Sequence, residues 1–62
     1  MSKLQLFRIN QKLNRIDMAK KLGVSESYYT KIELGIRNPS YNFLVKFKSK
    51  FNCKIDNIFF EY

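Results

Sequence analysis

The sequence predicts an all-α protein, a compact bundle of five short helices in which residues 1–62 form a single domain. Apolar residues recur at three- and four-residue intervals, as they do along one face of a helix. Capping residues precede these stretches, and glycine ends two of them. No stretch alternates apolar and polar residues as a half-buried strand would.

The first helix is expected to begin near Ser2, whose hydroxyl can cap it, with Leu6, Phe7 and Ile9 on its inner face. The second begins at Asn14, another capping residue. It ends at Gly23, which tolerates the left-handed conformation found at helix ends. Its inner face comprises Met18, Ala19 and Leu22.

The third helix begins at Ser25, whose hydroxyl can accept the N–H of Tyr28, and ends at Gly35. Its inward residues are Tyr29 and Ile32. A loop containing Asn38-Pro39 follows. The last two helices are predicted from the apolar spacing of Phe43, Leu44, Phe47 and Phe51, and then of Ile55, Ile58 and Phe59.

The chain is strongly basic, with 12 Lys and Arg against 5 Asp and Glu, a net charge of +7. Such a charge favours a nucleic-acid partner, although solubility, an anionic membrane or an acidic protein would also explain it. The sequence has no histidine, which is the commonest general base. It has a single cysteine, so an intramolecular disulfide cannot form. No apolar run is long enough to span a membrane. We expect a soluble protein of a reducing compartment.

Residues 14–33 have the layout of a helix-turn-helix: two capped helices with a glycine between them. In that motif the second helix enters the major groove of DNA. Many helix pairs of this kind do not bind DNA, so the motif alone is only moderately specific. Together with a net charge of +7, it indicates DNA binding.

The stretch "LNRIDMAKKLGVSESYYTKIELGIRNPS", followed by an aromatic helix and "CKIDNIFF", resembles the Cro/cI repressor family, also called the XRE family. The resemblance runs from about Arg8 to Phe59. The chain departs from the family pattern at Arg15, Leu34 and Lys54, where Gln, Asn and Ser are usual. The motifs that match, in order, are Leu13-Asn14, Met18-Ala19, Gly23-Val24-Ser25, Ile32-Glu33, Gly35, Asn38-Pro39 and Ile55-Asp56-Asn57-Ile58-Phe59.

This resemblance implies a lambda-repressor-like DNA-binding domain with its helix-turn-helix in helices two and three. It also implies an ion pair between Arg8 and Glu33 that ties the first helix to the third. A protein of this kind would work without catalysis, cofactor, metal or small-molecule substrate, by occupying an operator and blocking or recruiting polymerase. It would act in the bacterial or phage cytoplasm, in association with the nucleoid.

The exposed face of the third helix is expected to contact bases. At 100° per residue this face lies opposite Tyr29 and Ile32, and lysine, threonine and glutamate side chains match guanine, thymine and cytosine edges respectively. A merely solvated face is the alternative, and Glu26 is also favourable at a helix N-terminus on dipole grounds alone. The expected base contacts are Glu26, Ser27, Thr30 and Lys31.

A second group of residues suits phosphate oxygens, which fix register without reading sequence. For Ser25, capping alone is the alternative. The expected phosphate contacts are Arg15, Ser25, Tyr28, Arg37 and Asn38. The lysines at 46, 48, 50 and 54 are expected to form a solvated face, with Lys20 and Lys21 similar but closer to the DNA. Cys53 is expected to be a buried, inert thiol.

Phe60 and Tyr62 are expected to form a homodimer contact, because large apolar side chains clustered at an exposed terminus usually mark an interaction surface. The alternative is that they fold back onto the first helix. A dimer, at least on DNA, would read an approximately palindromic operator. The sequence therefore predicts a sequence-specific transcriptional regulator of double-stranded DNA, a repressor of phage or mobile-element type. The rival interpretation is a protein-interaction module, such as an antitoxin or anti-repressor, on the same fold.

Overall fold

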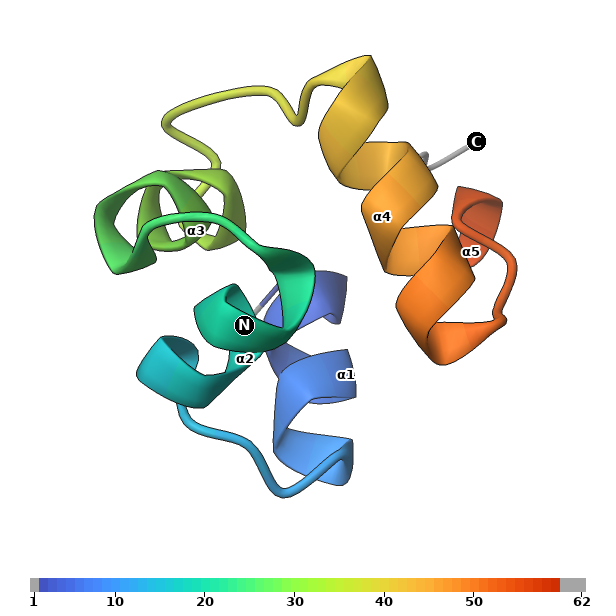
Figure 1. The fold of residues 1–62 in the computed structure, drawn as a ribbon, viewed down its shortest axis with the longest axis horizontal. Helices are drawn as coiled ribbons and strands as arrows, with labels where there is room; N and C mark the ends of the chain where they lie inside the picture. The colour runs from blue at the N-terminus through green and yellow to red at the C-terminus, as the bar shows by residue number, and fades with distance from the viewer. Residues whose placement is uncertain (1, 60–62) are drawn as a thin grey trace.

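A computed structural model describes residues 2–59, and these residues form helices and no strands. The helices are α1 (Lys3–Asn10), α2 (Arg15–Leu22), α3 (Glu26–Glu33), α4 (Tyr41–Phe51) and α5 (Asp56–Phe59). Figure 1 shows α2 and α3 joined by a tight turn, and a longer loop that runs from α3 to α4. The predicted all-α fold of five short helices is confirmed.

Side chains cap the helices where the sequence predicts. The Ser2 and Asn14 side chains accept backbone N–H groups at the starts of α1 and α2, and the Ser25 hydroxyl accepts the N–H of Tyr28 at 3.1 Å. Each cap satisfies an N–H group that has no partner within the helix. Ser40 caps α4 in the same way by accepting the N–H of Phe43.

Gly23 and Gly35 end α2 and α3 with left-handed backbone, at φ 68° and 77°. The N–H of Val24 donates to the Ala19 carbonyl, and the N–H of Gly23 donates to the Lys20 carbonyl. This pair of bonds is the Schellman arrangement of a helix C-terminus. The turn after α2 is therefore fixed by backbone hydrogen bonds. This turn sets the angle at which α3 leaves α2.

The core lies where α1, α2, α3 and α4 meet, and α5 packs on its edge. Its buried apolar residues are Leu4, Met18, Ala19, Leu22, Tyr29, Ile32, Phe43 and Phe47. The aromatic rings of Phe47 and Phe59 meet edge to face with centroids 5.1 Å apart, as do those of Phe7 and Phe51. Such edge-to-face contacts add to the stabilisation from apolar burial.

The predicted inner face of α1 is partly wrong. Leu6 and Ile9 are about half exposed, whereas Leu4 is buried and Phe7 packs against the core. Leu4, Phe7 and Arg8 lie three and four positions apart, so they share the face that meets the rest of the protein. The inner faces predicted for the other helices are the ones that pack in the structure.

Candidate nucleic-acid interface

Helix α3 presents a polar face to solvent and an apolar face to the core. Tyr29 and Ile32 are buried, whereas Glu26, Ser27 and Lys31 are exposed and Thr30 is half-buried. The reason is the helical period, since residues three and four apart share a face and the apolar ones are drawn into the core. The four side chains expected to contact bases thus lie on one short, capped helix.

Arg37, Tyr28 and Ser40 form a second group beside α3. The Arg37 guanidinium lies over the Tyr28 ring, 5.0 Å from its centroid. The Tyr28 hydroxyl accepts the Ser40 N–H at 3.2 Å, and its ring packs edge-on against Phe43. The Ser40 hydrogen bond is the main reason that the pKa of Tyr28 lies below its usual value, and the Arg37 charge adds to it. These contacts attach the start of α4 to α3.

This group has the chemistry of a phosphate-binding site. The Tyr28 hydroxyl accepts one hydrogen bond and retains its own proton for donation, and Arg37 is exposed beside it. Asn38 is also exposed in the same loop. Sequence reasoning did not include Ser40, although a serine three positions before Phe43, just after Pro39, is a helix-start signal that identifies it.

Glu33 lies at the end of α3 and joins three helices. Its side chain is fully buried and accepts from Arg8 Nε at 3.0 Å and Arg8 Nη2 at 3.2 Å. The remaining Arg8 donor Nη1 reaches the Leu13 carbonyl at 2.9 Å, so Arg8 also holds the α1–α2 connection. The structure thus brings Arg8 and Glu33 together in a forked, charge-assisted arrangement.

Arg15 is part of the same cluster, which sequence reasoning did not foresee. Its Nε donates to Glu33 Oε1 at 3.2 Å, and its side chain is 34% exposed. The interaction uses Nε, and a guanidinium carries further N–H donors on its two Nη atoms. No sequence signal links Arg15 to a residue 18 positions away, because the bond depends on how α2 and α3 pack.

Burial and hydrogen bonding act in opposite directions on Glu33. Burial raises the pKa of the Glu33 carboxyl, but the hydrogen bonds from Arg8 and other neighbours outweigh burial and hold the pKa below its usual value. Glu33 is therefore ionised at neutral pH. The Tyr29 hydroxyl is buried without a hydrogen-bond partner of good geometry, and burial raises its pKa far above the usual range.

The remaining predicted residues lie as follows. Lys46, Lys48, Lys50 and Lys54 are exposed, as expected of a solvated face. Cys53 is half-buried rather than buried, and burial raises the pKa of its thiol, which disfavours the reactive thiolate. Phe60 and Tyr62 lie outside the described residues.

The described residues offer neither a metal site nor a membrane span. Residues 2–59 contain no group of three or more His, Cys, Asp or Glu placed to hold a metal ion. Within the same range, none of the helices has the length and apolar character needed to cross a bilayer.

Comparison with known proteins agrees with this geometry. A family model described as helix-turn-helix matches residues 4–58, which includes all of α1 to α4 except Lys3. The chain belongs to the XRE-type helix-turn-helix family. Members of this family are DNA-binding transcriptional regulators, in which the second helix of the motif, here α3, is the recognition helix.

One curated relative supports the assignment to the XRE-type family. It is an uncharacterized HTH-type transcriptional regulator of Methanocaldococcus jannaschii, 40% identical over 58 residues, which cover 94% of this chain and 88% of the relative. No solved structure gives a significant match to the chain.

Proposed function

We propose that this chain is a sequence-specific regulator that binds an approximately palindromic operator as a homodimer and represses transcription, as in phage or mobile-element systems. The observation that carries the proposal is the exposed polar face of α3, with Arg15 bonded to Glu33 at the end of the helix and Arg37 over the Tyr28 ring. Bases would be read by this face, and phosphates would be held by its basic flanks.

Each contact follows from the chemistry of its side chain. Lys31 donates to guanine O6 and N7, and Glu26 accepts from the cytosine amine. Thr30 offers its methyl to thymine, and Ser27 donates or accepts. The phosphates are held by Arg15, Ser25, Tyr28, Arg37 and Asn38.

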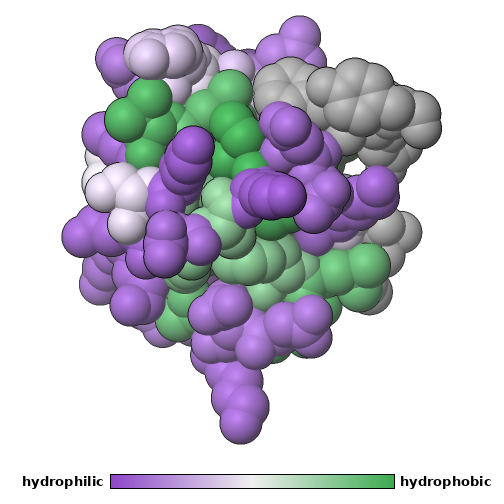
Figure 2. All heavy atoms as spheres, turned by 90° about the vertical axis from the view of Figure 1, so that its right-hand side faces the viewer, coloured by the Kyte–Doolittle hydropathy of each residue, from purple (hydrophilic) through white to green (hydrophobic). Residues whose placement is uncertain are grey.

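The overall size of the protein supports two copies side by side on one face of DNA. The protein measures 29 × 24 × 23 Å. Half-sites one helical turn apart place two recognition helices about 34 Å from each other. Two bodies of this width can therefore occupy successive major grooves without overlap. The side formed by α4 and α5 exposes apolar surface between hydrophilic side chains (Figure 2), which supports a dimer contact there.

Selection from a pool of random duplexes, followed by sequencing of the bound fraction, tests the proposal. We expect one enriched motif, an approximate palindrome with half-sites about one helical turn apart. A variant with Ser27, Thr30 and Lys31 all changed to Ala should enrich no motif. Failure of the wild-type protein to enrich any sequence, with tight binding to a protein partner instead, would favour the rival interpretation of an antitoxin or anti-repressor.

A further inference from the structure

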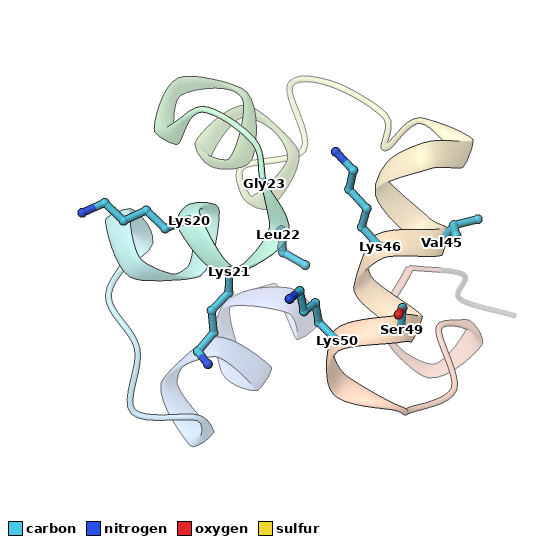
Figure 3. Close-up of a pocket in the computed structure, with 8 residues that line it drawn as sticks. All are labelled: Lys20, Lys21, Leu22, Gly23, Val45, Lys46, Ser49 and Lys50. Atoms are coloured by element: carbon cyan, nitrogen blue, oxygen red, sulfur yellow. The ribbon is translucent and has the colours of Figure 1, made fainter.

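A groove of about 430 Å³ separates the C-terminal end of α2 from α4. Lys20 and Lys21 line it from α2, and Lys46 and Lys50 line it from α4, with Val45 beside them. Figure 3 shows the Lys46 and Lys50 side chains extending from α4 towards α2, with the Lys46 amine close to Gly23. The Lys46 and Lys50 amines therefore border the groove, whereas the Lys20 side chain extends away from α4 (Figure 3).

The Lys46 amine has a specific position in this groove. Its Nζ lies 3.6 Å from the place that a Cβ would occupy on Gly23, at the C-terminal end of α2. A helix C-terminus carries partial negative charge, so it favours a cation there. The exposed Lys46 amine therefore lies beside the C-terminal end of α2, where a cation is favoured.

Carboxylates of the described part of the chain do not line this groove. Glu33 is buried against two arginines, and Asp17, Glu26 and Asp56 lie at the first turns of α2, α3 and α5. The positive charge of the groove is thus left for a ligand from outside. A second copy of this chain is a poor candidate for this groove, because its exposed described carboxylates are single residues on three different helices and form no acidic segment.

Apolar surface inside the groove distinguishes a peptide from a bare anion. The methylene stems of Lys46 and Lys50 supply apolar surface beneath their amines. None of the residues proposed to contact DNA lines the groove. We propose that this groove binds an acidic segment of a partner protein, in which carboxylates alternate with apolar side chains.

Titration of isotope-labelled protein with a synthetic peptide of alternating Glu and Leu residues, followed by NMR, tests this proposal. We expect amide shifts concentrated around Gly23, Val45 and Ser49, and no binding by a peptide in which Gln replaces every Glu. The double variant Lys46→Glu/Lys50→Glu should lower the affinity for the peptide about tenfold. The matched variant Lys48→Glu/Lys54→Glu has the same net charge but alters exposed lysines outside the groove, and should bind nearly as the wild type.

Several results would overturn the proposal: no binding of the Glu/Leu peptide, shifts centred on α3, or equal weakening by the two double variants. Stronger loss of random-sequence duplex binding in Lys46→Glu/Lys50→Glu than in its matched variant would assign the groove to DNA instead. The neutral pair Lys46→Gln/Lys50→Gln and Lys48→Gln/Lys54→Gln repeats the comparison if a charge reversal disturbs folding. The groove lies apart from the α3 face. The result of the peptide titration therefore does not decide whether α3 selects a DNA sequence, and the duplex selection does not decide whether the groove binds a peptide.

Discussion

At the scale of single residues, the Glu33 carboxylate accepts hydrogen bonds from Arg8 on α1 and Arg15 on α2. The buried negative charge of Glu33 is thus compensated by positive charges on two other helices. Removing one partner of a buried pair costs far more than the pair itself contributes, because the other charge remains buried without compensation.

Glu33→Gln should therefore lower the free energy of unfolding by about 3–5 kcal/mol, measured by urea denaturation. Arg8 would keep a neutral acceptor but lose the opposite charge while only 12% exposed. Glu26→Gln is the matched control, since it removes an exposed carboxylate from the same helix, and should cost less than about 1 kcal/mol. Equal losses in the two variants would show that the cluster contributes little.

Stability should also fall on the acid side of the Glu33 titration. The unfolded carboxyl binds its proton at a higher pH than the folded one, so unfolding takes up a proton as the pH decreases. The stabilisation that ionised Glu33 gives the folded state is complete above the ordinary pKa of 4.5. It is lost as the pH falls through the lower pKa of the folded state. NMR titration of the side-chain carboxyl should place Glu33 below 4.5, and a midpoint at or above that value would contradict the hydrogen-bonded arrangement.

At the scale of the helices, Ser25 has two roles that can be separated. Its hydroxyl caps α3 by accepting the N–H of Tyr28, and we propose that it also contacts a phosphate. Aspartate is as good a cap as serine but repels phosphate, whereas alanine gives up both interactions.

Ser25→Asp should keep the wild-type stability and weaken binding to every duplex, whereas Ser25→Ala should lose about 1 kcal/mol of stability. Thermal unfolding and duplex titration measure the two effects. Ser2→Asp is the matched control, because it adds the same charge at the cap of α1 and should leave duplex affinity nearly unchanged. If Ser25→Asp bound duplexes with wild-type affinity, Ser25 would cap α3 without contacting a phosphate.

Local signals explain why the helix boundaries were predictable. Each N-terminal cap joins residues only three positions apart, as at Ser2, Asn14 and Ser25. Each glycine adopts its left-handed backbone by itself, as at Gly23 and Gly35. Both signals are local, so they can be recognised in the sequence without knowledge of the fold. The face of α1 was misassigned, because Leu4 and Leu6 are equally apolar and only the packing of the other helices selects Leu4.

The candidate site was predictable to the same extent. The polar face of α3 follows from helical periodicity, whereas the Arg15 bond to Glu33 and the Tyr28 bond to Ser40 depend on how the helices pack. The backbone shows the same limit: Lys12 after α1 and Asn52 after α4 adopt left-handed geometry, whereas glycine marks it after α2 and α3. An asparagine there is a weaker signal than glycine.

At the scale of the whole molecule, the proposed homodimer makes a stoichiometric prediction. Analytical ultracentrifugation should give two copies per palindromic duplex, with weak association in the absence of DNA. Phe60→Asp combined with Tyr62→Ser should reduce the stoichiometry or the affinity on that site, because a symmetric contact would bury both aromatics in each copy. The control Leu6→Ser/Ile9→Ser removes exposed apolar groups from α1 instead. Unchanged binding by the terminal variant would place the contact elsewhere.

The central claim is that α3 reads bases while its flanks hold phosphates. The most direct test measures the affinities of wild type, Lys31→Ala and Arg37→Ala for the selected operator and for its single-base-pair variants. Lys31→Ala should lose about 1–3 kcal/mol of discrimination at one base pair, whereas Arg37→Ala should weaken all duplexes about equally. Uniform weakening by Lys31→Ala, with no loss of discrimination at any position, would contradict base reading by α3.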